Sequence, residues 1–418
     1  MIANEKGPET LIINNDKAGS RVDPTRLSAL ISRFHHLYGE RPSLRFFSAP
    51  GRAEIGGNHT DHQHGRVLAA AVNLDILCVA APNDSGIIRV DSLGSHHLSL
   101  NDLALRESEN NTSASLIRGI CSRFIQSGYK IAGFDACLTS DVLVGSGLSS
   151  SAAFEVAIST ILNCLFNDGL IAPEKIALIS QYAENVYFRK PSGLMDQMTS
   201  AVGGLVMIDF ADPERPELER IDYDFSESGH FLCVTGPLGS HSDLTDAYAA
   251  ITGEMRLIAS YFKKDTLREV EPEAFYRALP VLRTTVPDRA ILRASHFFSE
   301  NARALSQARA LQRRDFAEFL RLVNESGHSS FQYLQNVCHG DDMILAIALS
   351  ESERVLAGTG ASRVHGGGFA GTIQAFVPYE KLDEYSATMD RLFGAGSCHV
   401  LNIRSEGAGE LDIKAREL

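Results

Sequence analysis

The most informative stretch of the chain is Gly145-Ser146-Gly147-Leu148-Ser149-Ser150-Ser151-Ala152-Ala153. A glycine-rich turn exposes backbone N–H groups. The apolar run after it predicts a helix over residues 152–166, whose N-terminus carries a partial positive charge. Three hydroxyls supply further donors, and one of them can ligate Mg²⁺. The pattern predicts a phosphate-binding loop that is distinct from a P-loop, because no G-x-x-x-x-G-K-[ST] occurs here. A serine-rich helix cap is the simpler alternative, but three serines exceed what capping needs.

A second polar stretch precedes it, between apolar segments: Ala49-Pro50-Gly51-Arg52-Ala53-Glu54-Ile55-Gly56-Gly57-Asn58-His59-Thr60-Asp61-His62-Gln63-His64-Gly65. Its side chains offer the donors and acceptors that bind sugar hydroxyls. One alternative is a rigid surface loop whose polar groups cap one another. Another is a zinc site, because histidine and aspartate are zinc ligands. The ligand order differs from the His-x-His-x-Asp-His string of zinc hydrolases, so zinc is the weaker alternative.

A third cluster, Arg363-Val364-His365-Gly366-Gly367-Gly368-Phe369-Ala370-Gly371, formally matches the dinucleotide-binding G-x-G-x-x-G. That fingerprint must open a helix, whereas residues 372–377 read as a strand. We therefore expect these glycines either to pack closely against another loop or to form a plain turn. A fourth stretch, 184–198, places Asp196 among apolar residues. Taken alone, such an aspartate is as consistent with a structural role as with a catalytic one.

Composition sets the outer limits. The 418 residues carry a formal net charge of −13, which argues against a protein that coats nucleic acid. Seven scattered cysteines without a C-x-x-C pair indicate reduced thiols. No apolar run of 18 residues and no signal peptide is evident, so we expect a cytoplasmic protein without membrane contact. The irregular order of predicted helices and strands favours an α+β fold. The polar, proline-rich segment 209–220 predicts a domain boundary.

Together and in this order, the motifs resemble those of the GHMP small-molecule kinases, most closely the galactokinase branch. The resemblance runs from about Phe34 to Gly409. It implies a two-lobed α+β fold with the active site in the cleft. The N-terminal lobe would be of the ribosomal-protein-S5-domain-2-like type, and the C-terminal lobe an α/β sandwich. We accordingly expect a flexible tail over 1–20, the first lobe over 21–212 and the second over 213–418.

The resemblance also implies roles for individual residues. Asp196 and Arg52 would be catalytic. Asp196 would lie beside the sugar O1, and Arg52 would neutralise the charge of that oxygen and of the incoming phosphoryl group. Ser151 and Glu184 would hold Mg²⁺. The phosphates of ATP would bind to Gly145, Ser146, Gly147, Leu148, Ser149, Ser150, Ser151 and Ala152. The sugar would bind to Glu54, Asn58, His59, Asp61, Gly193 and Tyr248.

The chain departs from the usual Gly-Arg-x-Asn-Leu-Ile-Gly-Glu-His-x-Asp-Tyr pattern of galactokinases. Glu54 replaces the Asn, Gly56 the Ile, Asn58 the Glu and His62 the Tyr. The usual Glu contacts the sugar 6-hydroxyl, whereas a neutral amide at Asn58 would no longer repel a 6-carboxylate. Galacturonate is therefore an alternative substrate, although Glu54 could compensate for the change.

The sequence thus predicts an ATP-dependent sugar 1-kinase, in first place one that converts D-galactose to galactose 1-phosphate. The alternatives are a galacturonokinase or related sugar 1-kinase, and a non-catalytic galactose sensor on the same fold. The phosphate-binding loop 145–153 (the phosphate loop) is shared with mevalonate and homoserine kinases. The polar stretch 49–65 (the sugar loop) is not. We expect ATP and Mg²⁺ as cofactors, small molecules as partners, and a monomer or weak dimer.

Overall fold

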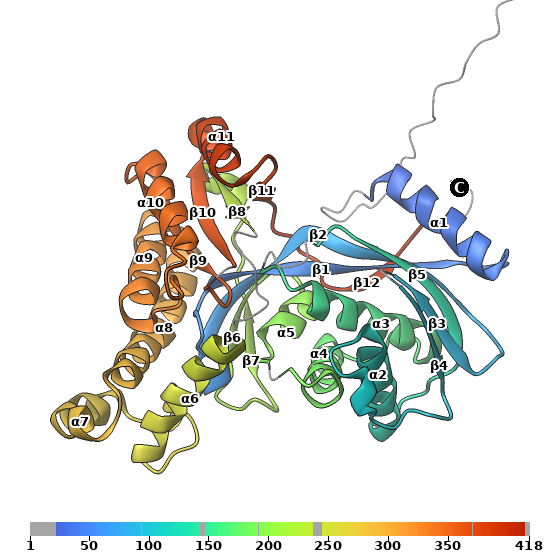
Figure 1. Ribbon diagram of the computed structural model, residues 1–418. Helices are drawn as coiled ribbons and strands as arrows, with labels where there is room; N and C mark the ends of the chain where they lie inside the picture. The colour runs from blue at the N-terminus through green and yellow to red at the C-terminus, as the bar shows by residue number, and fades with distance from the viewer. Residues whose placement is uncertain are drawn as a thin grey trace, which may run out of the picture.

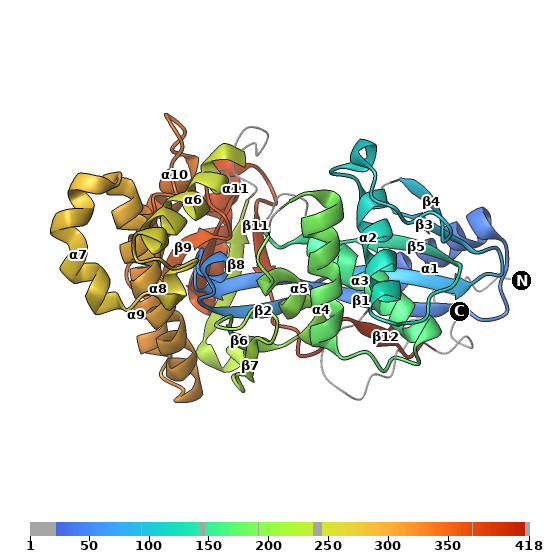
Figure 2. The ribbon, with the colours of Figure 1, turned by 90° about the horizontal axis from the view of Figure 1, so that it is seen from below.

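Two β-sheets organise the chain in the computed structural model, which describes residues 22–92, 94–142, 147–190, 192–236, 245–369 and 371–413. Figure 1 shows the two sheets with helices packed around them, and the seven helices from α1 to α7 follow the chain from one end of the molecule to the other. Seen from below in Figure 2, the helices α6 to α11 gather at one end and α1 to α5 at the other. This mixed architecture confirms the α+β prediction.

The first sheet has eight strands, in the order β12-β1-β2-β5-β3-β4, with β6 pairing with β2 and β7 pairing with β6. The strands are β1 (Arg45–Gly56), β2 (Arg66–Pro82), β3 (Ile87–Asp91), β4 (Ser95–Ser99), β5 (Phe134–Ser140), β6 (Leu205–Asp209), β7 (Glu217–Arg220) and β12 (Gly409–Leu411). All pairs are antiparallel except β3 with β5. The apolar run of β2 is buried along most of its length, because helices cover this sheet.

The helices of the first sheet lie on opposite faces (Figure 1). On one face are α2 (Ser113–Gln126), α3 (Ser150–Phe166), α4 (Pro173–Tyr182), the π-helix η3 (Ala183–Phe188) and α5 (Met195–Val202). On the other lies α1 (Pro24–Tyr38), which buries Leu27, Leu30 and Phe34 against the sheet. The helix α3 is buried over most of its surface, because its small residues Ala152, Ala153 and Ala157 allow close packing.

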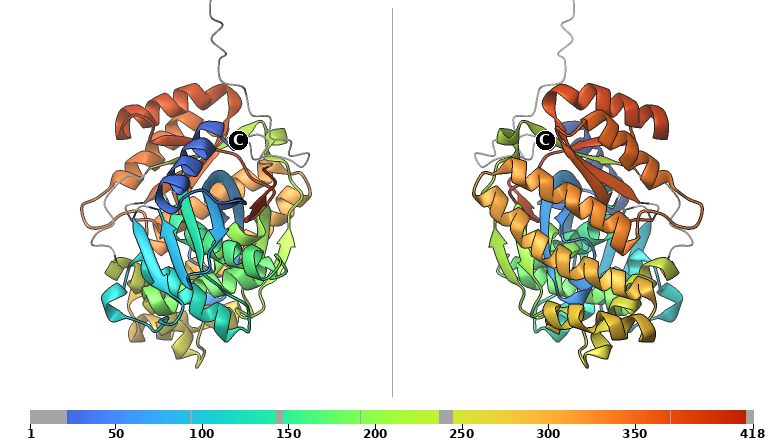
Figure 3. Two further views of the ribbon diagram at one scale, coloured as in Figure 1. Left: turned by 90° about the vertical axis from the view of Figure 1, so that its right-hand side faces the viewer. Right: turned by 90° about the vertical axis from the view of Figure 1, so that its left-hand side faces the viewer.

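The second sheet has the order β11-β8-β10-β9, all antiparallel. Its strands are β8 (His230–Thr235), β9 (Ala361–His365), β10 (Thr372–Pro378) and β11 (Cys398–Leu401). Its helices are α6 (Thr245–Tyr261), α7 (Pro272–Thr285), α8 (Asp288–Gln312), α9 (Phe316–Ser329), the π-helix η6 (Ser330–Leu334), α10 (Ile344–Leu356) and α11 (Leu382–Phe393). Short 3₁₀ turns complete the described part: η1 (Asp61–Gln63), η2 (Glu107–Glu109), η4 (Phe225–Ser228), η5 (Leu267–Glu269) and η7 (Tyr379–Lys381). The side views of Figure 3 show α8 and α9 lying across one end of the molecule.

The chain crosses between the two sheets more than once. The proline-rich segment around residue 212 lies between β6 and β7, which pair with each other in the first sheet. The chain enters the second sheet at β8, and near its end β12 returns to pair with β1. The division at residues 212 and 213 stays a prediction, and the predicted tail over 1–20 lies outside the described residues.

Two local predictions are confirmed. The helix expected over 152–166 corresponds to α3, and the strand expected over 372–377 corresponds to β10. The helix α4 continues into a π-helix at Ala183. None of the helices in the described part of the chain has the length and apolar character needed to cross a bilayer.

Candidate active site

The three glycine-rich and polar motifs, far apart in sequence, meet at one place. The backbone N–H of Arg52 donates to Leu148 O at 3.1 Å, which joins the polar stretch 49–65 to the phosphate-binding loop. Asn58 Nδ2 donates to Gly366 O at 2.7 Å, which joins the polar stretch to the third motif. A side chain at Gly147 would contact His365, so the phosphate-binding loop and the third motif also touch. Close packing of the third motif against another loop is what its glycines predicted.

The phosphate loop leads directly into α3. Gly147 and Ser149 have positive φ angles of 71° and 57°, and the helix begins at Ser150. Ser150, Ser151 and Ala152 therefore form the first turn, where backbone N–H groups lack partners within the helix. This geometry suits an anion. Gly145 and Ser146 lie outside the described residues.

The buried Arg52 and the half-buried Asp196 form an ion pair beside this helix terminus. Arg52, at the middle of β1, donates from Nε to Asp196 Oδ1 at 2.6 Å, and also bonds Gly147 O. Ser149 Oγ donates to the other carboxylate oxygen of Asp196. Burial by itself raises the pKa of Asp196, but the charge and hydrogen bonds of Arg52 and the Ser149 hydroxyl hold it below its ordinary value. Asp196 is therefore a carboxylate at neutral pH.

A second carboxylate, Glu184, lies on the π-helix η3 near the same terminus. Ser151 Oγ donates to Glu184 Oε1 at 3.3 Å, and Lys190 Nζ lies 2.9 Å from the same oxygen. The other oxygen accepts from Gln197 Nε2 at 2.7 Å. A hydroxyl and a carboxylate at this separation are hard oxygen donors of the kind that bind Mg²⁺, so the pair fits that ion.

Gln197 also connects Glu184 to a deeper carboxyl group. Its Nε2 donates to Glu155 Oε2 at 3.0 Å, and Glu155 is fully buried in α3. Burial, and next the charge of Glu184, raise the pKa of Glu155 well above its ordinary value. One amide thus holds two carboxyl groups in place.

Asp61 packs directly against Gly193. The Asp61 carboxylate accepts the backbone N–H of His62 at 2.8 Å, and a Cβ at Gly193 would overlap its other oxygen. Burial, and next the charge of Asp196, raise the pKa of Asp61 to about 7. Gly193 therefore makes room for a carboxylate that is only half ionised near neutral pH.

His59 and His62 form a hydrogen-bonded chain. His59 Nε2 lies 3.0 Å from Gly367 O, and a carbonyl only accepts, so that nitrogen carries the proton. His59 Nδ1 must then accept from His62 Nε2, at 3.2 Å. Burial lowers the pKa of both imidazoles, which keeps them neutral. Both ring nitrogens of His59 are thus engaged by protein atoms, and its role as a sugar ligand stays a prediction.

The hydrogen bond between His59 and His62 also concerns the alternative of a zinc site. Among the described residues, no group of three or more His, Cys, Asp and Glu side chains is arranged to hold a metal ion. The His59 and His62 rings bond each other instead.

Asn58 is engaged on all sides. Its amide donates to Glu54 Oε1 at 2.9 Å and to Gly366 O, and Oδ1 accepts from Ser330 Oγ at 3.1 Å and Asn336 Nδ2 at 3.0 Å. The side chain is 0% exposed. All four hydrogen-bonding positions of the amide are used within the protein.

Glu54 is part of the same buried network. It forms an ion pair with Arg363 of β9, whose side chain is 0% exposed. Gly56, which replaces the usual Ile, has no room for a side chain, because a Cβ there would overlap Gln307. The departures at these positions therefore fit one another in the folded chain.

Tyr248, from α6, reaches the third motif. Its hydroxyl donates to Gly368 O at 2.9 Å, and its ring packs edge-on against Phe369, at 5.3 Å between centroids. A Cβ at Gly367 would overlap the Tyr248 ring. Its role as a sugar ligand stays a prediction.

Two polar residues that support the sugar loop were missed from the sequence. On α8, Glu300 Oε1 accepts the backbone N–H of Gly57 at 3.1 Å, and His296 Nε2 donates to Asn58 O at 2.9 Å. Burial by itself would raise the pKa of Glu300, but the charge of Arg303 lowers it to about 2. His296 and Glu300 are four residues apart and so lie on one face of α8, among apolar neighbours. Two polar residues on an otherwise apolar face were the sequence signal that could have identified them.

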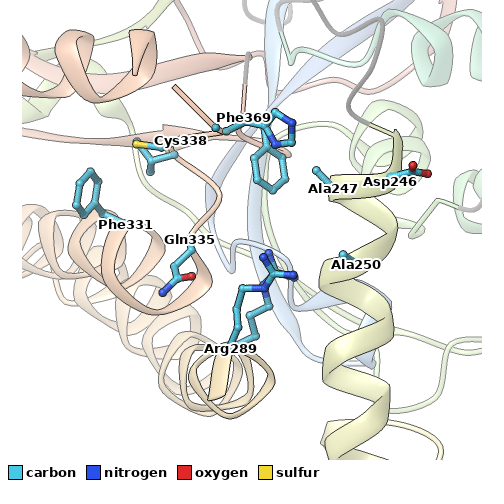
Figure 4. Close-up of a pocket in the computed structure, with 12 residues that line it drawn as sticks. Asp246, Ala247, Ala250, Arg289, Phe331, Gln335, Cys338 and Phe369 are labelled. Carbon is cyan, nitrogen blue, oxygen red and sulfur yellow. The ribbon is translucent and has the colours of Figure 1, made fainter. Parts of the chain in front are cut away.

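A pocket of about 660 Å³, shown in Figure 4, is lined by Phe369 of the third motif and by residues of α6 and α8. Phe369 lies above Arg289 in Figure 4, and Arg293 also belongs to the lining. Both arginines are paired with Glu254 of α6. The pocket is lined by none of the predicted site residues.

Two family models match parts of this chain. The galactokinase galactose-binding signature matches residues 32–82, and the GHMP kinases N terminal domain matches residues 115–204. A galactokinase from Glaesserella parasuis serovar 5 is 34% identical over 369 residues, covering 84% of this chain and 90% of the relative. One from a Roseiflexus species is 30% identical and covers 93% and 98%.

Solved structures share the fold. The crystal structure of Lactococcus lactis galactokinase complexed with galactose has a TM-score of 0.79 at 21% identity, covering 92% of this chain and 99% of that one. A mevalonate kinase has a TM-score of 0.61 at 14% identity, covering 86% and 99%. The sequence relatives, with the arrangement of the three motifs, place this chain in the galactokinase family of GHMP kinases, and it is a sugar kinase.

Proposed function

We propose that this enzyme transfers the γ-phosphoryl group of ATP to O1 of D-galactose and forms galactose 1-phosphate and ADP. The observation that carries the proposal is the Arg52–Asp196 ion pair at the N-terminus of α3, with Ser149 donating to the other carboxylate oxygen. It puts a carboxylate for the acceptor hydroxyl next to a helix terminus suited to phosphate.

In the proposed reaction, Asp196 accepts a hydrogen bond from the sugar O1 hydroxyl. O1 attacks the γ-phosphorus, the bond from phosphorus to the ADP oxygen breaks, and the O1 proton passes to Asp196. Because the pKa of Asp196 is held below its ordinary value, orientation of the hydroxyl comes first and proton transfer is late. Arg52 stabilises the charge that spreads over the transferring group.

The phosphates would lie at the first turn of α3, along Gly147 to Ala152. Ser151 and Glu184 would hold Mg²⁺, which neutralises the β- and γ-phosphate oxygens. The 3.3 Å hydrogen bond between these two side chains supports a shared ion. The remaining catalysis is positioning by buried, preorganised groups.

Asp61 is the proposed anchor for the sugar hydroxyls, because its carboxylate lies across from Asp196 with Gly193 leaving room beside it. A carboxylate can accept two hydroxyls of a pyranose at once. Tyr248 and His59 would shape the wall through the third motif.

Galactose is favoured over galacturonate for a structural reason. Galacturonate was an alternative because Asn58 is neutral and could face position 6 of the sugar. The Asn58 side chain is instead fully buried with all of its hydrogen bonds made, and Glu54 lies beside it. The carboxylate of the usual pattern is kept in the network, four residues earlier.

A coupled ADP-release assay with Mg·ATP tests the proposal. The sugars are D-galactose, D-galacturonate, N-acetylgalactosamine, D-glucose and L-arabinose. We expect turnover on D-galactose well above the others. Preference for galacturonate would replace the proposed substrate, and sugar binding without turnover on any of them would favour the non-catalytic sensor.

A further inference from the structure

Lys190 places a positive charge on the carboxylate that is proposed to hold the metal ion. Its Nζ lies 2.9 Å from Glu184 Oε1, the oxygen that also accepts from Ser151 Oγ. The Lys190 side chain is 55% exposed, whereas that of Glu184 is 2% exposed. The ammonium group thus approaches the buried carboxylate from the open side of the site.

The backbone after η3 holds Lys190 in this position. Arg189 has a φ of 70°, which is uncommon for a non-glycine residue. This turn brings the backbone N–H of Lys190 to 3.1 Å from Glu184 O. Lys190 therefore contacts Glu184 through both its backbone and its side chain, and the left-handed residue before it is the common way to end a helix.

The surroundings of Lys190 are negatively charged. Glu184, Asp196 and Glu155 all act on its charge. The other cation of the site, Arg52, is engaged by Asp196 and Gly147 O. Lys190 thus contacts a proposed metal ligand and lies close enough to the proposed acceptor carboxylate to feel its charge.

A metal ion bound at Glu184 would compete with the ammonium group of Lys190 for the same carboxylate oxygen. Oε2 of Glu184 accepts from Gln197 and Ser192, so Oε1 is the oxygen that faces Ser151 and Lys190. An ion shared by Ser151 and Glu184 would add two positive charges beside the ammonium group at Oε1 and would repel it. A lysine has a flexible stem and an exposed head, so it can move to a nearby anion at little cost.

We propose that Lys190 is a further catalytic residue, whose ammonium group rests on Glu184 in the nucleotide-free enzyme and binds the γ-phosphoryl group when Mg·ATP is bound. This rests on the proposed function. A charged hydrogen bond made to the γ-phosphate, and to neither of the other two phosphates, would strengthen binding of the triphosphate selectively.

Equilibrium binding separates this role from a structural one. Binding of Mg·ADP and of the magnesium complex of adenylyl imidodiphosphate is measured by calorimetry for the wild type, Lys190→Met, Lys190→Arg and the control Lys130→Met. Lys130 is exposed in the loop after α2. We expect Lys190→Met to weaken binding of the triphosphate analogue about tenfold or more and that of Mg·ADP less than threefold. Lys190→Arg should recover most of the loss.

The outcomes are distinct. Equal effects of Lys190→Met on both nucleotides, or no effect on either, would overturn the role of Lys190. Failure of the wild type to bind either nucleotide would instead count against the proposed function.

Wild-type protein provides a second test that needs no variant. Lysines are acetylated with an activated acetate ester in the presence of Mg·ADP or the triphosphate analogue, and the Lys190 peptide is quantified by mass spectrometry. We expect the analogue to protect Lys190 at least threefold more than Mg·ADP, with Lys130 unchanged. Equal labelling of Lys190 with the two nucleotides contradicts the proposal.

Discussion

Asn58 Nδ2 donates a 2.9 Å hydrogen bond to Oε1 of Glu54, and both side chains are buried between the sugar loop and the third motif. Compared with the usual galactokinase pattern, the carboxylate and the carboxamide have exchanged places. Because the two groups bond each other, the exchange keeps one negative charge in the network, and Arg363 pairs with it. Two departures that look independent in the sequence are one arrangement in the structure.

This pairing predicts that Asn58→Glu alone is destabilising. It places a second carboxylate against Glu54 and removes the donors to Glu54 and Gly366 O. We expect a loss of about 3 kcal/mol in the free energy of unfolding, as for an unpaired buried charge. Glu54→Asn with Asn58→Glu should recover at least half of that loss. Urea denaturation measures both, and an Asn58→Glu variant as stable as wild type would refute the coupling.

Asp196→Asn should abolish most of the turnover and keep the fold. The amide still fits between Arg52 and Ser149 but neither takes a proton nor carries the charge that holds the sugar hydroxyl. We expect kcat to fall by about 10²–10⁴-fold, with the KM for galactose changed only a few-fold. Asp212→Asn, in the turn between β6 and β7, is the matched control and should be neutral. Near-normal kcat for Asp196→Asn would mean that the acceptor carboxylate is misassigned.

Asp61 predicts a pH dependence of sugar binding. Burial, followed by the charge of Asp196, raises its pKa to about 7, and only the charged form accepts two sugar hydroxyls. The KM for galactose should therefore rise about tenfold per pH unit as the pH falls below about 7. Asp61→Asn should raise KM strongly and remove this pH dependence. A KM that is constant between pH 5.5 and 8 would contradict the assignment.

The raised pKa of Asp61 also makes the stability of the folded protein depend on pH. Sugar binding needs the charged form of Asp61, whereas folding is favoured by the protonated form. The folded protein holds a proton on Asp61 that the unfolded chain releases above its ordinary pKa of 3.8. The cost of the buried charge is therefore absent below pH 3.8 and is complete above about pH 7. Above pH 7, ligand-free Asp61→Asn should melt at a higher temperature than the wild type, and an equal or lower Tm would argue against a strained Asp61.

Gly193→Ala should disturb the sugar site through Asp61. The added methyl overlaps the Asp61 carboxylate, while the backbone of Gly193 lies outside the left-handed region and tolerates alanine. We expect the KM for galactose to rise about tenfold and the Tm to change little. Gly253→Ala, on α6 with open space around it, is the control and should bind galactose normally. Unchanged KM for Gly193→Ala would show that Asp61 can move away freely.

Much of the fold was predictable because local patterns dominate in its elements. The apolar runs of α3 and β2 and the periodicity of α1 identify elements that are buried on one or more faces. The return of β12 to the first sheet was not predictable, because three residues carry no pattern and their pairing with β1 is decided by distant contacts. The π-helix over Ala183–Phe188 was not predictable, because six residues are too few to show a period that differs from that of the α-helix before them.

The sequence by itself determined which family this chain belongs to and which residue types it brings to phosphoryl transfer. Glycines expose backbone N–H groups to a phosphate, serines supply hydroxyls, and these residue types can be read from the sequence directly. Only the tertiary structure decided what each side chain faces. It engages Asn58 and His59 with protein atoms, sets Asp61 against Gly193, and brings Lys190 to Glu184. Hydrogen bonds, burial and like-charge proximity depend on positions in space, and residues far apart along the chain become neighbours only when the two sheets and their helices pack together.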